Sequence, residues 1–142
     1  MDALQWNESF SVGIALIDEQ HKTWIERLNA LAAAINTHAA QAQVAETLGF
    51  LVDYTGFHFS TEQAIMQEQH YPGYPGHLQK HEELKATLAE LVRDFEEEGA
   101  TQSLAHAVNT FLGNWLIKHI QQVDQQFGAF VKEKSMLTGN KA

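Results

Sequence analysis

The sequence predicts an all-α protein, an up-down-up-down antiparallel four-helix bundle preceded by an N-terminal arm. Four long segments repeat apolar residues at helical spacing, and no alternating strand pattern competes with them. Both prolines fall in the turn sequence 71–76, which divides the 142 residues into two halves of similar length. Because short connections join long amphipathic helices, consecutive helices should run antiparallel. We expect one domain over residues 1–142, with an arm over 1–16, the bundle over about 17–130 and a C-terminal tail over 131–142.

The first helix is expected over about 18–38, with Asp18 as its N-cap. Its apolar stripe includes His21, which lies four residues after Ile17 and four before Ile25. The arm before this helix is rich in apolar residues and should pack across the bundle.

The other helices are expected over about 43–69, 76–97 and 101–127, with Gly99 ending the third. Aromatic side chains on these helices are expected to pack in the core rather than bind a cofactor: Phe57, Phe59, Phe111 and Trp115. The tail around 132–134 is expected to fray.

Composition excludes several classes of protein. The chain has no cysteine, so it has no disulfide, iron–sulfur cluster, thiolate zinc site or cysteine nucleophile. Its formal net charge of −9, from 18 acidic and 9 basic side chains, should repel nucleic acid and anionic membranes. No apolar run is long enough to cross a bilayer, and residues 1–6 do not read as a signal peptide. We therefore expect a cytoplasmic protein.

Seven possible metal ligands fall on the core stripes of the four helices: His21, His58, Glu62, His77, His81, His119 and Asp124. Two pairs are spaced i, i+4, which places both side chains on one helix face, about 5–6 Å apart at Cβ. Unpaired carboxylates are costly to bury, so this arrangement indicates a metal site.

The number of ligands indicates two ions. Five imidazoles and two carboxylates exceed the roughly four ligands of a single zinc. They suit two six-coordinate ions that share both carboxylates, and imidazole with carboxylate suits iron.

The pair His119 and Asp124 fits least well. Five residues at about 100° each place Asp124 roughly 140° from His119 on a regular helix. A local π-helical widening, a bend in the helix or a long-reaching rotamer could each correct this.

Three further histidines lie about 100° or more away from the ligand stripes, namely His38, His70 and His106. We expect them to be solvated. His38 and His70 should lie near helix C-termini, where a cation is favoured.

With these seven residues in this order, the chain resembles the hemerythrins, and more closely the single-domain bacteriohemerythrins. The likeness covers roughly residues 6–130. It extends to the phrases Ser11–Ile14, Ile17–His21, Phe57–Glu62, Met66–Glu68, Tyr71–Tyr74 and Trp115–Ile120.

The resemblance implies two iron ions bridged by Glu62, Asp124 and an oxo or hydroxo group. It assigns His77, His81 and His119 to one iron, and His21 and His58 to the other, which keeps an open position for dioxygen. An apolar pocket should keep water and protons from that position, and its candidate residues are Leu116, Ile120 and Phe59.

The function that we expect is reversible dioxygen binding for carriage or storage, without catalysis. Ferritin-like oxidases use two Glu-x-x-His elements, and none lies on a core stripe here. The alternatives are an oxygen or redox sensor, a scavenging enzyme for peroxide or nitric oxide, and iron handling. The expected partners are dioxygen and an oxygen-consuming enzyme that receives it, and we expect a monomer.

Overall fold

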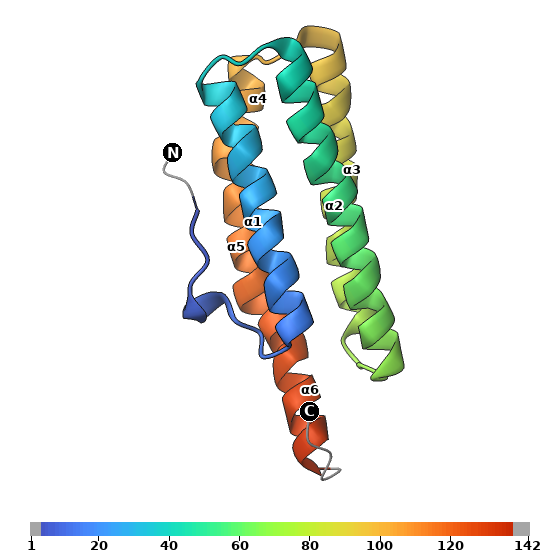
Figure 1. Ribbon diagram of the computed structural model, residues 1–142. Helices are drawn as coiled ribbons and strands as arrows, with labels where there is room; N and C mark the ends of the chain where they lie inside the picture. The colour runs from blue at the N-terminus through green and yellow to red at the C-terminus, as the bar shows by residue number, and fades with distance from the viewer. Residues whose placement is uncertain (1–3, 138–142) are drawn as a thin grey trace.

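The computed structural model describes residues 4–137, and within them all regular secondary structure is helical (Figure 1). After a short 3₁₀ turn at Glu8–Phe10 come α1 (Ala15–Asn36), α2 (Gln41–Glu68) and α3 (Tyr74–Glu98). The fourth long helix is continuous but mixed, with α4 (Gln102–His106), α5 (Gly113–Lys118) and α6 (Gln125–Leu137) separated by two π-helical segments, η2 (Ala107–Leu112) and η3 (His119–Asp124). The four long helices lie side by side and antiparallel, which confirms the predicted four-helix bundle. No helix within residues 4–137 is long and apolar enough to cross a membrane.

The π-helical segments change which side chains face the core. Hydrogen bonds from residue i to i+5 fit more residues into each turn than an α-helix does. From residue 104 to residue 120 the buried apolar side chains of the last helix therefore recur every four residues, namely Leu104, Val108, Leu112, Leu116 and Ile120.

Two of the predicted core aromatics are in fact exposed. Phe111 is 45% exposed because η2 turns Leu112 into the core in its place. Phe57 is 58% exposed because it lies one residue, or about 100°, before the buried His58. Phe59 is buried as expected, and Trp115 is partly buried.

The start of α1 corrects the expected N-cap. The helix begins at Ala15 with Ile14 as N-cap and no capping side chain, so Asp18 lies within the first turn. Its carboxylate instead accepts hydrogen bonds from the Ser11 hydroxyl at 2.6 Å and from the Val12 amide at 2.8 Å. Asp18 thus holds the arm against α1.

The arm packs across two helices, as its apolar composition predicts. Asn29 of α1 exchanges two hydrogen bonds with the Leu4 backbone, at 3.0 and 2.7 Å. Gln125 of α6 donates to the Ser9 carbonyl at 2.7 Å, and Phe10 is buried.

The last helix is longer than expected. It continues through Leu137, where we expected a frayed tail, and Lys134 donates to the Gln69 carbonyl at 2.7 Å across the end of α2. Phe130 packs against Tyr71 with ring centroids 5.1 Å apart, which adds apolar contact to this extension. The rest of the expected tail, residues 138–142, lies outside the described residues, as do residues 1–3 of the arm.

The arm lies so close to α6 that Gly128 leaves no room for a side chain. A Cβ at Gly128 would lie 1.9 Å from the Val12 carbonyl oxygen, whereas a Cβ at Gly49 on α2 would meet nothing within 4 Å. Gly128→Ala should lower the free energy of unfolding by about 2 kcal/mol, because backbone must move to relieve the clash. Gly49→Ala should raise it by up to about 1 kcal/mol, because alanine favours the helix. Urea denaturation of both variants tests the pair, and equal stabilities would contradict the close approach.

Candidate metal centre

The seven predicted ligand side chains converge in one buried cluster inside the bundle. His21 comes from α1, His58 and Glu62 from α2, His77 and His81 from α3, and His119 and Asp124 from η3. None of them is more than 3% exposed. The four long helices therefore all contribute to the cluster.

The ligand atoms form two overlapping groups, each with its atoms within 4.8 Å of one another. The groups are Glu62, His77, His81, His119 and Asp124, and His21, His58, Glu62 and Asp124. Both carboxylates belong to both groups. The arrangement thus offers two adjacent positions with two shared carboxylates, one with three imidazoles and one with two.

The contacts around Glu62 and Asp124 are short. Glu62 Oε1 lies 3.0 Å from His77 Nε2 and 3.1 Å from His81 Nε2. Asp124 Oδ1 lies 2.9 Å from His77 Nε2 and 3.1 Å from His119 Nε2, while Asp124 Oδ2 lies 2.9 Å from His21 Nε2. Glu62 of α2 therefore reaches two imidazoles of α3, whereas Asp124 reaches imidazoles of α1, α3 and its own helix.

Several of these buried atoms have no hydrogen-bond partner, which fits a bound cation. They are Nε2 of His21, His58 and His119, Oε2 of Glu62 and both carboxylate oxygens of Asp124. His21 Nε2 and Asp124 Oδ2 are 2.9 Å apart yet not hydrogen-bonded. An unpartnered buried acceptor costs roughly 1–3 kcal/mol, so six of them in one place indicate that cations satisfy them. Nitrogen and oxygen donors without thiolate fit iron.

The pKa shifts favour a neutral His58 and charged carboxylates, as a cation would require, while His77 must lose its proton to bind one. Burial lowers the pKa of His58 to about 4, against the raising effect of the Glu62 charge. Burial would lower the pKa of His77 too, but its short contacts with Asp124 and Glu62 raise it to about 9. Burial would raise the pKa of Asp124, but the neighbouring His119, His21 and His77 hold it well below its usual range. The metal-free cluster thus keeps its carboxylates charged, with His77 as a counter-charge.

The π-helical segment η3 brings His119 and Asp124 to one face. In a π-helix, residues i and i+5 lie nearly one above the other on the same face. On an α-helix, the side chains of His119 and Asp124 would point in different directions. Of the three alternatives for this pair, the structure has the π-helical widening, and it places His119 Nε2 3.1 Å from Asp124 Oδ1.

Two glutamines that sequence reasoning missed support the imidazoles from outside. His58 Nδ1 lies 2.8 Å from Gln20 Oε1, and His81 Nδ1 lies 3.0 Å from Gln63 Oε1. An Nδ1–H donated to an amide oxygen leaves the Nε2 lone pair free for a metal. The sequence holds one indication of these glutamines, which is that each is next to a predicted ligand: Gln20 precedes His21, and Gln63 follows Glu62.

Aromatic rings enclose the imidazoles. Phe59 stacks on His81 with centroids 3.7 Å apart and an interplanar angle of 5°, and Trp115 stacks on His119 at 4.5 Å and 12°. Trp24 packs against His58 at 5.0 Å. These contacts restrict the rotation of the rings.

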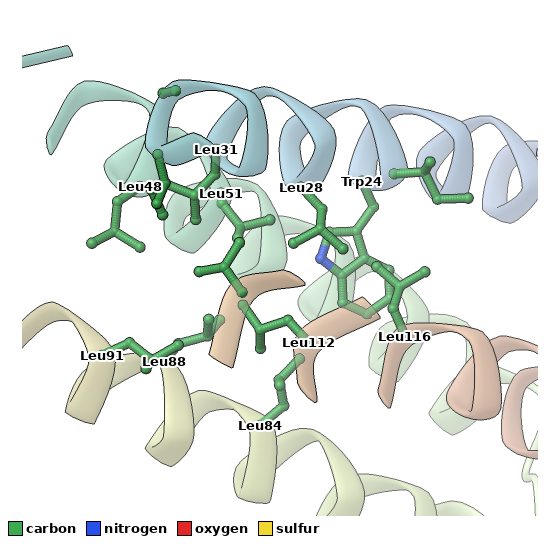
Figure 2. Close-up of a cluster of buried hydrophobic side chains, with 14 of the residues drawn as sticks. Trp24, Leu28, Leu31, Leu48, Leu51, Leu84, Leu88, Leu91, Leu112 and Leu116 are labelled. Atoms are coloured by element: carbon green, nitrogen blue, oxygen red, sulfur yellow. The ribbon is translucent and has the colours of Figure 1, made fainter. Parts of the chain in front are cut away.

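An apolar cavity of about 10 Å³ lies on the far side of Trp24, at the limit of what one water molecule needs. Its lining comprises Trp24, Leu28, Leu51, Thr55, Leu84, Leu88, Leu112, Trp115 and Leu116. Figure 2 shows Leu116 of the last helix beside the Trp24 ring. Ile120 and Phe59 are buried but do not line this cavity.

The three remaining histidines are exposed, as predicted. His38 and His70 follow the C-termini of α1 and α2 in the left-handed conformation, each with φ of 55°. His106 lies on the outside of α4. None of them belongs to either ligand group.

The Hemerythrin HHE cation binding domain family matches residues 12–131. The bacteriohemerythrin of Stenotrophomonas maltophilia is 36% identical over 132 residues, which is 93% of this chain and 84% of that protein. The myohemerythrin of Sipunculus nudus is 29% identical over 89% of this chain and 92% of its own. A crystal structure of wild-type hemerythrin superposes with a TM-score of 0.80 at 27% identity, covering 90% of this chain and 97% of that one. The predicted resemblance is confirmed, and the chain belongs to the hemerythrin family.

Proposed function

We propose that this protein binds dioxygen reversibly at a non-haem di-iron centre, for oxygen carriage or storage. The observation that carries the proposal is the pair of overlapping ligand groups that share Glu62 and Asp124. Two bound irons would supply the electrons that hold dioxygen and are returned when it leaves.

The two positions differ in the number of imidazoles. His77, His81 and His119 would hold one iron, and His21 and His58 would hold the other. With one imidazole fewer, the second iron keeps room for an exogenous ligand. Dioxygen is therefore proposed to bind on the side of His21 and His58.

The residues beside that position favour binding over catalysis. Trp24 packs on His58, and the apolar cavity lies behind it. The Trp24 indole N–H donates to the Thr55 hydroxyl at 2.9 Å, and that hydroxyl donates to the Leu51 carbonyl at 2.7 Å. The Trp24 N–H and the Thr55 hydroxyl are therefore both engaged and do not donate a proton to bound dioxygen. Without a proton donor, dioxygen can leave unchanged.

An optical spectrum tests the function directly. The reduced, iron-loaded protein should gain a charge-transfer absorption in air and lose it under argon. It should do so over repeated cycles, because dioxygen leaves as dioxygen. Irreversible oxidation during the first exposure would contradict reversible binding.

Iron content tests the ligand assignment. The loaded protein should hold about two irons per chain, as two shared carboxylates and five imidazoles require. His77→Ala or His21→Ala should lower this content. The exposed control variants His38→Ala, His70→Ala and His106→Ala should retain it in elemental analysis. Loss of iron from a control variant, or a content of one iron in the unmodified chain, would overturn the assignment.

Leu116 is proposed to protect the oxygenated state. Leu116→Ala should enlarge the apolar cavity, admit water and speed conversion to the ferric form several-fold, with iron content unchanged. Leu31→Ala is the matched control, because Leu31 is equally buried in the core but does not line the cavity. Both variants should lose about 2–5 kcal/mol of stability. The decay rate of the oxygenated spectrum distinguishes them, and equal rates would show that Leu116 does not protect the site.

A further inference from the structure

Most of the last helix lacks exposed acidic side chains, although the whole chain carries a formal net charge of −9, and Glu133 near the C-terminal end of α6 is the exception. Within residues 99–132 the sole acid is Asp124, which is 1% exposed and belongs to the metal cluster. The same stretch carries Lys118 and Lys132. The negative charge of the protein is therefore concentrated on the rest of its surface.

A groove of about 210 Å³ opens between α3 and this helix. We call it the basic groove, and it is lined by Lys80, Trp115, Lys118, His119, Gln122 and Val123. Both lysines are exposed, and within residues 4–137 the salt bridges formed by lysine involve Lys22 and Lys85 instead. The groove thus presents two exposed lysines for which no ion pair is found among the described residues.

The basic groove reaches the metal cluster through one side chain. His119 lines the groove and also lies 3.1 Å from Asp124 Oδ1 inside the cluster. The partly exposed Trp115 ring stacks on His119 with centroids 4.5 Å apart. One imidazole and the ring stacked on it therefore separate solvent from the iron position.

An exposed aromatic residue adds an apolar contact near the groove. Phe111 is 45% exposed and precedes Trp115 by four residues, about one helical turn. Exposed aromatic side chains beside charged ones are typical of binding surfaces.

We infer that the basic groove is the docking site for the acidic face of an electron-donor protein, an inference that rests on the proposed function. A ferric centre does not bind dioxygen, so a carrier that oxidises needs a reductant. At each encounter the donor would lose one electron and one bound ferric ion would become ferrous, and any proton that a bridging oxygen takes up would come from solvent. Two encounters would restore the diferrous form.

A protein fits the basic groove better than a small reductant does. Pockets for small ligands usually measure about 300–1,000 Å³, which is larger than this hollow. Electron-transfer partners instead meet through small interfaces, below about 1,200 Å², and rely on opposite charges to steer association. The part of the helix surface over residues 99–132, which has no exposed acidic side chain, provides that complementarity.

The test compares two double variants that each remove two positive charges. Lys80→Gln/Lys118→Gln alters the basic groove, and Lys22→Gln/Lys85→Gln alters lysines paired with Glu19 and Glu82 elsewhere. Reduced flavodoxin, an acidic one-electron donor, is mixed with the ferric iron-loaded protein at low salt. The groove variant should be reduced about tenfold more slowly and the control less than twofold, because steering depends on local charge. The difference should vanish in high salt.

Two further measurements separate docking from damage. Reduced methyl viologen, a small cation, should reduce the groove variant at least as fast as the unmodified protein. Carbodiimide cross-linking to oxidised flavodoxin, mapped by mass spectrometry, should join Lys80 or Lys118 to flavodoxin carboxylates. Equal flavodoxin rates in the two variants, or cross-links elsewhere, would overturn the inference. The cross-links need no dioxygen, so a failure of oxygen binding would be recognised separately.

Discussion

The structure depends on two carboxylates buried among five imidazoles. Glu62 and Asp124 belong to both ligand groups, and each has short contacts with side chains of other helices. Such charges are tolerated inside a protein when they are paired or bind metals. Because the contacts join helices rather than neighbours in the chain, the cluster ties α1, α2, α3 and the last helix at one level of the bundle. The helices that pack through their apolar side chains are thus also held together by the buried polar cluster.

The buried cluster of histidines and carboxylates could be predicted from the sequence because its signal is local. Spacings of four residues on an apolar stripe determine which side chains share a face, and a regular helix preserves that relation. Even the irregular pair His119 and Asp124 carried its own signal, since five residues do not fit an α-helical face. The result is a cluster whose members come from all four long helices.

Other features could not be predicted because they depend on relations between elements. Gln20 supports His58 across two helices, and stripe analysis along one helix does not detect such a contact. Asp18 serves the arm rather than the helix end, because α1 begins one turn earlier than its polar residues suggest. Phe111 was misplaced because η2 moves the buried stripe to Leu112. The basic groove combines residues of α3 and the last helix, so the sequence does not reveal it either.

The π-helical segment at His119–Asp124 also determines which way the side chains of α6 face. Each extra residue in a turn shifts the phase of the downstream helix by about 100°. Gly128, four residues after Asp124, faces the Val12 backbone in the phase that η3 produces. A single-residue deletion that restored a regular helix would therefore turn the Asp124 carboxylate away from the cluster and disturb the contact between the arm and α6, while the hydrogen bonds of the arm to α1 would remain. The irregular turn therefore sets two contacts at once. It turns Asp124 into the buried cluster, and it turns Gly128 toward the backbone of the N-terminal arm.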